Sequence, residues 1–298
     1  MPSHERHHFI PDAFLSVWER PPGPKLTYFT NRNGDVMGGR VTAKNAAKRL
    51  GLYTLHTVKP RDRNALEVDH FQRIDNAGAA VHRTLLTANN PTELTEAQRG
   101  AWIAFVISLG LRTPRHLRWE TARTAQFLHQ AAYGDGARED FREAFEQQMG
   151  ARGELAGDMT KAAAADLSGG CSWHPIFADA TWGLRDLSSS KADLLIGDDP
   201  VIRCGRLKAG EVFAVVLPIS PTQLFYATNS AAIVEWMEAI LADELVFVAN
   251  RDATTKATEY VYATGMHHLD FARRFLSQEV AQGNSYLAHA LGFRAPTS

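Results

Sequence analysis

The stretch TEAQRGAWIAFVISLGLRTP, Thr95 to Pro114, contains the most apolar run of the chain and the signals that bound it. The run from Ala101 to Leu111 is about half as long as a membrane span. We therefore expect a buried helix from Glu96 to Leu111, capped by Thr95. Thr113 can cap a second helix, because proline is favoured at the first helical position and Pro114 follows it.

Elements upstream of this run mix helix and strand. Pro11 to Trp18 reads as a short helix, and Asn33-Gly34 predicts a turn between a strand at Leu26 to Phe29 and one running towards Val41. A long helix is expected over 64–86, since its apolar positions recur at steps of three and four; they are Phe71, Ile74, Gly78, Val81 and Leu85.

Downstream, the predicted secondary structure changes from mainly helix to a mixture of strands and helices after residue 150. The helix that starts at Pro114 should end near Gly134, and another should follow over 137–149. The segment 150–170 is rich in Ala, Gly and Asp, and we expect a mobile connection or a poorly packed helix there. Beyond it, apolar or alternating runs predict strands and then helices; the strands are 193–197, 211–217 and 223–228, and the helices are 231–242 and 264–276.

Together these elements predict a helix-rich α+β fold. A mainly helical half, 1–150, would pack on a mixed α/β half, 171–298, that contains a small sheet. We expect one domain over 1–298, with 150–170 as the place of any subdivision.

Composition bounds the function classes. The chain has 298 residues and a formal net charge of −1, so no strong overall field draws nucleic acid or an anionic membrane. This does not exclude a small nucleotide or an RNA end. Two cysteines, Cys171 and Cys204, make no disulfide framework, and the N-terminus shows no signal peptide, so we expect a cytoplasmic protein without a membrane partner. Phosphate-binding glycine loops, the serine-hydrolase elbow and zinc-peptidase motifs are absent from the sequence.

Several polar residues in the first half are candidates for chemistry. His7 and His8 precede Pro11 and could act as a base, a ligand or a phosphate contact, or simply cap a backbone group. Glu67 lies on the apolar stripe of its helix and needs a partner, for which Arg112 is the natural candidate. Glu67 and His70 also have the spacing of helical di-metal sites, but no second such pair occurs.

Four positions in the second half are further candidates. Asp198 and Asp199 follow an apolar strand and could hold Mg²⁺ or act as a base, although Asp-Pro is also a common start of a turn. Asn250 and Arg251 follow the apolar run 245–249 and are weaker candidates of the same kind.

His8-Phe9-Ile10-Pro11, followed by Phe14-Leu15, resembles the opening signature of the bacterial domain-of-unknown-function family 4238. Later family motifs are matched in order by Glu67, Arg112-Thr113-Pro114, Gly197 to Pro200, Pro218 to Pro221, and Asn250. The chain departs from the pattern at Gly197 (usually Ser), at Asp199 (usually Asn), and at His7 and Asp12, where glutamine-like residues are expected. The resemblance covers nearly the whole chain and implies a shared site, not a reaction.

Three functions fit these residues. The first is a hydrolase, a nuclease or phosphoesterase, with His8, Glu67, Arg112 and Asp198 as catalytic groups. Its ligand-binding residues would be His7, Asp199, Asn250 and Arg251, with Mg²⁺ or Mn²⁺ as an optional cofactor and a nucleotide or nucleic acid as substrate. The second is a binding module for a nucleotide or another anion. The third is an interaction protein whose polar network is structural. A common site requires the four catalytic candidates to lie together.

Overall fold

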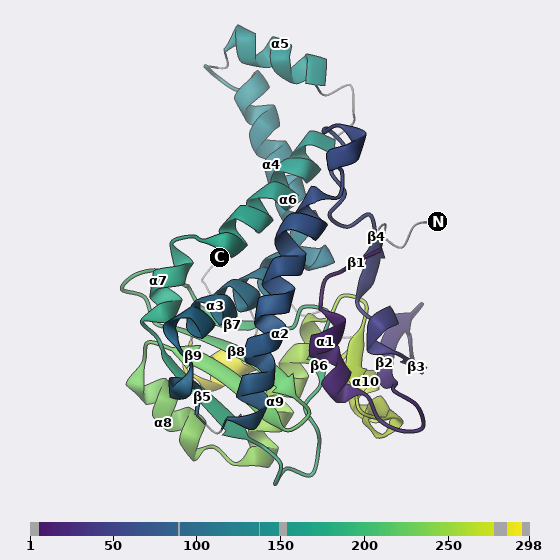
Figure 1. Ribbon diagram of the computed structural model, residues 1–298, viewed down its shortest axis with the longest axis vertical. Coiled ribbons are helices and arrows are strands. Elements are labelled where there is room, and N and C mark those ends of the chain that lie inside the picture. The colour runs from purple at the N-terminus through teal and green to yellow at the C-terminus, as the bar shows by residue number, and fades with distance from the viewer. Residues whose placement is uncertain (1–5, 89, 137, 149–153, 277–284, 294–298) are drawn as a thin grey trace.

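Helices and three antiparallel sheets make up the computed structural model, which describes residues 6–88, 90–136, 138–148, 154–276 and 285–293 (Figure 1). The strands are β1 (Arg6–His8), β2 (Leu26–Arg32), β3 (Asp35–Val41), β4 (Lys48–Leu50), β5 (Thr181–Asp186), β6 (Ile196–Gly197), β7 (Ile202–Gly205), β8 (Phe213–Ser220), β9 (Gln223–Thr228) and β10 (Val261–Ala263). The α-helices are α1 (Asp12–Leu15), α2 (Gln72–Thr87), α3 (Glu96–Leu111), α4 (Pro114–Tyr133), α5 (Glu139–Gln148), α6 (Glu154–Gly169), α7 (Trp173–Ala178), α8 (Ala231–Ala239), α9 (Ala242–Lys256), α10 (Leu269–Phe275) and α11 (Tyr286–Ala290).

The predicted helix over Glu96–Leu111 is confirmed as α3, with the expected caps. The Thr95 hydroxyl accepts the backbone N–H of Gln98, whose side chain accepts the N–H of Thr95, which forms a capping box. After Arg112, the hydroxyl of Thr113 accepts the N–H of His116 and α4 begins at Pro114. Two helices therefore meet at Arg112, and its backbone cannot move without disturbing both.

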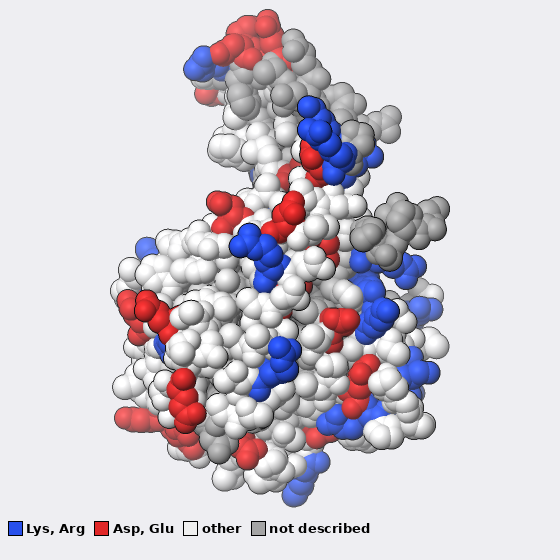
Figure 2. Space-filling model, viewed as in Figure 1, with Lys and Arg blue, Asp and Glu red and all other residues white. Residues whose placement is uncertain are grey.

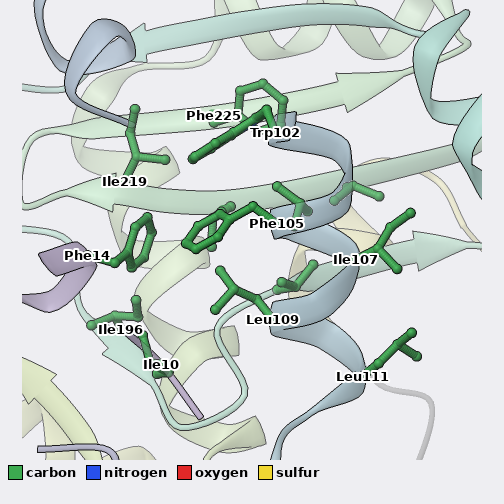
Figure 3. Packing of buried hydrophobic residues seen from close by; sticks show 14 of the residues in the cluster. Ile10, Phe14, Trp102, Phe105, Ile107, Leu109, Leu111, Ile196, Ile219 and Phe225 are labelled. Atoms are coloured by element: carbon green, nitrogen blue, oxygen red, sulfur yellow. The ribbon is translucent and has the colours of Figure 1, made fainter. Parts of the chain in front are cut away.

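Helix α3 is the centre of the main core because its side chains are apolar on nearly every face. Figure 3 shows Trp102 and Phe105 of α3 between Phe14 of α1 and Phe225 of β9. Ring centroids of Trp102 and Phe225 lie 5.6 Å apart, and those of Phe14 and Phe105 lie 5.5 Å apart. This core joins residues from both ends of the chain.

One sheet contains strands from both halves of the sequence. Its order is β3-β2-β10-β6, and Tyr262 of β10 lies opposite Tyr28 of β2 on one side and Ile196 of β6 on the other. The second large sheet has the order β5-β9-β8-β7, and β1 pairs with β4. The α+β class is confirmed, but a division between a helical half 1–150 and a mixed half 171–298 is not clearly drawn, because the hairpin β2–β3 lies in a sheet with β6 and β10.

Several local expectations are corrected. Within segment 150–170, Glu154–Gly169 forms helix α6 and not a mobile connection; of the two alternatives the helix is present, with its small residues Ala164, Ala165 and Ser168 buried. The run 245–249 lies within helix α9, which also contains Asn250 and Arg251. Asn250 and Arg251 therefore do not follow the end of a strand as Asp198 does, because a short apolar run has no period that separates helix from strand. Strands β1, β4, β5, β7 and β10 were not predicted.

Helices α4, α5 and α6 form an arm that projects from the rest of the molecule (Figure 1). On the face shown in Figure 2, basic and acidic side chains are interspersed over both the arm and the body. Among the helices of the described ranges, none is both long enough and apolar enough to span a membrane.

Candidate functional site

Arg112 is a fully buried charge at the junction of α3 and α4. Its Nη2 donates to Oδ1 of Asp75 on α2 at 2.6 Å, and its backbone carbonyl accepts the hydroxyl of Tyr53 at 3.2 Å. Its Nε and Nη1 are buried without a hydrogen-bond partner. Burial acts to lower the pKa of Arg112, but Asp75, Tyr53 and Glu67 outweigh burial and raise it. The guanidinium therefore stays charged and has unused donors.

Glu67 lies close to Arg112 without pairing with it. It belongs to a single π-helical segment, Leu66–Phe71, that leads into α2, and its Oε2 is buried without a hydrogen-bond partner. Burial raises the pKa of Glu67 to about 7, although the charge of Arg112 acts to lower it. The expected ion pair between Glu67 and Arg112 is therefore corrected, because the carboxylate that holds Arg112 is Asp75.

His8 joins the same electrostatic group from the end of β1. Its Nε2 donates to the carbonyl of Lys44 at 3.2 Å, which leaves Nδ1 with the lone pair of the neutral ring. Burial lowers the pKa of His8 to about 4, with smaller contributions from Lys48 and Arg112. His8 is consequently neutral near pH 7.

His7 and Tyr53 lie next to this group and contact each other. The His7 ring is buried and stacks on Tyr53 with centroids 5.4 Å apart, and its Nδ1 accepts the backbone N–H of Tyr53 at 2.8 Å. Desolvation raises the pKa of the Tyr53 hydroxyl well above its usual range. We call His8, Glu67, Asp75 and Arg112, with Tyr53 behind them, the Arg112 cluster.

Asp198 is held by a different part of the backbone. Its two carboxylate oxygens accept the N–H groups of three consecutive residues between α9 and β10, at 2.7–3.1 Å; they are Thr258, Glu259 and Tyr260. Burial raises the pKa of Asp198 to about 6, against these three bonds. The structure thus brings His8, Glu67 and Arg112 together and gives Asp198 a set of loop contacts of its own.

Asp199 faces a group of cations. Its Oδ1 is buried without a hydrogen-bond partner. Burial raises its pKa, while Arg203, Lys256 and Arg115 act to lower it. Any ligand that contacts Asp199 would therefore also lie near these three positive charges.

Asn250 and Arg251, consecutive residues of α9, make different contacts. The Asn250 amide accepts the N–H of Leu195 at 2.7 Å and donates to the carbonyl of Asp193 at 2.9 Å. The Arg251 guanidinium stacks on the ring of Tyr286, 3.1 Å from its centroid, and its Nε is buried without a hydrogen-bond partner. Asn250 thus fixes the backbone that leads into β6.

A group able to hold a metal ion lies beside that backbone. One ligand atom from each of Asp193, His267 and His268 lies within 4.8 Å of the others. This group was not expected from the sequence, whose metal candidates were the pairs Glu67-His70 and Asp198-Asp199.

Some of the missed residues left a signal in the sequence. Asp75 follows Phe71 by one helical turn and Glu67 by two, so it lies on the same stripe and could have been found. The adjacent pair His267-His268 was visible, but its link to Asp193 depends on the pairing of β10 with β6, which was not predicted. Tyr53 lies outside helices and strands and left no signal.

Comparison with known proteins identifies the family of this chain. No curated protein and no solved structure matches the chain. The model of the family described as "Protein of unknown function (DUF4238)" matches residues 6–267, which is most of the chain. The matched range contains His8, Glu67, Asp75 and Arg112. The match agrees with the family resemblance seen in the sequence. This chain therefore belongs to the DUF4238 family.

Proposed function

We propose that the Arg112 cluster binds an anionic phosphoester and hydrolyses it. The observation that carries the proposal is the combination of two unpartnered donors on buried Arg112 with a nearby unpartnered carboxyl, Glu67, whose pKa is about 7. A buried guanidinium with free N–H groups suits a phosphate oxygen. A carboxyl that titrates near neutral pH suits proton transfer.

In this proposal Glu67 acts as the general base. It takes a proton from water as the water oxygen attacks phosphorus, the ester P–O bond breaks, and the leaving oxygen departs as an anion. Arg112 stabilises the charge on the phosphoryl oxygens. Asp75 holds the guanidinium in place, and neutral His8 orients the water or the ester. Asp198 contributes by holding the turn before β10. Because the Arg112 donors are buried, ligand entry requires the surrounding side chains to move.

Two further expectations stay proposals. A Mg²⁺ or Mn²⁺ requirement would use the free oxygen of Asp199 with water and substrate phosphate. A cytoplasmic location is supported by the two free thiols, Cys171 and Cys204.

The test is hydrolysis of bis(p-nitrophenyl) phosphate and p-nitrophenyl phosphate, with p-nitrophenyl acetate as the uncharged control and with and without Mn²⁺. We expect a phosphoester to be cleaved, kcat/KM to rise with pH through about 7 as Glu67 ionises, and Glu67→Gln to remove at least 99% of the rate, of order 10²-fold. Hydrolysis by Glu67→Gln at the wild-type rate would overturn the role of Glu67.

A second function, binding of an anion without turnover, is favoured by the complete burial of Arg112 and its ion pair with Asp75. It predicts saturable binding of inorganic phosphate with no cleavage of either phosphoester. Absence of both binding and cleavage would leave the polar network a structural role only.

A further inference from the structure

We propose that Asp193, His267 and His268 form a binding site for a divalent transition-metal ion. The donors are two imidazole nitrogens and one carboxylate oxygen, all within 4.8 Å of one another. The proposal goes beyond the function proposed for the Arg112 cluster and does not depend on it.

Strand pairing brings the three residues together. Tyr262 of β10 lies opposite Ile196 of β6, and Val261 lies opposite Gly197. Continuing this antiparallel register places Asp193 opposite Gly265, directly before the single 3₁₀ turn Met266–His268 that leads into α10. The hydroxyl of Thr264 donates to Oδ2 of Asp193 at 2.6 Å, which ties the two segments together at this point.

His268 gives an independent sign of a ligand. Its side chain is only 5% exposed, and its Nε2 is buried with no hydrogen-bond partner. Buried ring nitrogens in folded proteins nearly always have a partner. A metal ion bound to this group would supply one. His267, by contrast, is exposed, and its ring lies 4.1 Å from that of His268.

The surroundings hold the carboxylate in place. Asn250 donates to the carbonyl of Asp193 and accepts the N–H of Leu195, so the backbone of Asp193 and Leu195, just before β6, is fixed to α9. Thr264 fixes the carboxylate itself. Such outer contacts orient the ligands of metal sites. Asn250 and Thr264 would therefore be positioning residues of this site.

Gly265 leaves room for the His267 ring. Its backbone is extended, with φ −163°, so an alanine could adopt it without strain. A Cβ at this position, however, would lie 2.7 Å from Nδ1 of His267. Gly265→Ala should therefore displace the His267 ring without substituting any of the three ligand residues.

The donor set indicates the class of ion. Imidazole suits Zn²⁺, Co²⁺, Ni²⁺ and other first-row ions, whereas Mg²⁺ and Ca²⁺ prefer oxygen ligands alone. Three protein ligands leave at least one coordination position for water or another ligand, as in reactive rather than purely structural zinc sites. We therefore expect a site that binds Zn²⁺ or Co²⁺ and keeps a bound water.

The experiment uses the full chain, freed of metal with a chelator and titrated with Zn²⁺ by calorimetry and with Co²⁺ by visible absorption. We expect one Zn²⁺ per chain, a rise in melting temperature on binding, and a Co²⁺ spectrum showing nitrogen and oxygen ligands. His267→Ala and Gly265→Ala should each weaken Zn²⁺ binding at least tenfold, about 1.4 kcal/mol. His289→Ala, another exposed histidine, should leave it unchanged.

Because His267 is exposed, His267→Ala should fold, and its melting temperature without metal should match that of the wild type. No Zn²⁺ or Co²⁺ binding by the wild-type chain, or equal binding by His267→Ala, would overturn the proposal. No substrate enters this experiment, so its failure and a failure of the phosphoester proposal are separate results.

Discussion

Asp75 Oδ1 lies 2.6 Å from Nη2 of Arg112, and this ion pair joins α2 to the junction of α3 and α4. Arg112 is completely buried, whereas the Asp75 side chain keeps 20% of its surface exposed. The pair uses one nitrogen of the guanidinium and leaves Nε and Nη1 without partners. It therefore fixes the arginine and still leaves donors for a ligand.

Asp75→Asn should destabilise the protein strongly. It removes the charge that compensates a buried guanidinium, which costs about 3–5 kcal/mol when one partner of a buried pair is lost. Urea denaturation measures the change. Asp62→Asn is the matched control, because the Arg61–Asp62 pair is exposed and its loss should cost less than about 1 kcal/mol. Similar losses for the two variants would mean that the Arg112–Asp75 pair contributes little.

Glu67→Gln should change how stability depends on pH. The pKa of Glu67 is about 7 in the folded protein against an ordinary value of 4.5, so the folded state holds the proton more tightly than the unfolded state. The resulting stabilisation is complete below about pH 4.5, declines as pH rises, and is lost above about 7.

The glutamine variant stays neutral throughout. Its unfolding free energy, minus that of the wild type, should rise between pH 5 and 8 and then level off. We expect an increase of about 1–2 kcal/mol, after allowing for screening of a partly exposed carboxyl. Urea midpoints at four pH values measure it, and a difference that does not change with pH would contradict a raised pKa.

Gly78→Ala tests the packing of α2 on α3. A Cβ at Gly78 would lie 2.2 Å from the ring and 2.8 Å from Cβ of Phe105, which is itself fixed in the main core. Overpacking of this kind costs about 1–3 kcal/mol. Gly100→Ala, in the same helix pair but facing open space, should instead stabilise by about 0.5–1 kcal/mol. Thermal unfolding of both variants gives the comparison, and stabilisation by Gly78→Ala would refute the close contact.

Asn250→Ala should destabilise the start of β6. It removes two hydrogen bonds to the backbone of Asp193 and Leu195 and leaves a buried N–H without a partner, which costs about 2–4 kcal/mol. Asn31→Ala, which loses one bond to Gly34 in an exposed turn, should cost less than about 1 kcal/mol. Chemical denaturation of the two variants measures both losses. Equal losses would show that the hydrogen bonds of Asn250 to Asp193 and Leu195 do not stabilise the start of β6.

Long helices with clear boundary signals could be predicted from the sequence. The caps at Thr95 and Thr113 and the apolar run between them locate α3 and the start of α4, and Asn33-Gly34 locates the hairpin β2–β3. Strands β6 and β10 have two and three residues in the structure. Such short strands carry no readable alternation, since their formation depends on the neighbours that they pair with.

The candidate site could be predicted only in part. Burial on a helix stripe identified Glu67, and position after an apolar helix identified Arg112, but the choice of Asp75 as the partner depends on how α2 rotates against α3. Asp198 and Asn250 resemble active-site residues in sequence because both follow apolar runs. In the structure, both hold backbone groups of neighbouring segments, a role that residue type and spacing do not distinguish from ligand binding.

Calorimetric titration with inorganic phosphate tests the anion site at Arg112 most directly, using the wild type and Arg112→Lys well below their melting temperatures. Lysine keeps the charge but loses the planar fork of donors. Arg185→Lys is the control, because Arg185 is partly buried and, like Arg112, has an Nη1 without a hydrogen-bond partner. We predict that the wild type and Arg185→Lys bind one phosphate with a Kd below about 1 mM and that Arg112→Lys binds at least tenfold more weakly, about 1.4 kcal/mol. Absence of phosphate binding by the wild type, or equal binding by Arg112→Lys, would contradict the account.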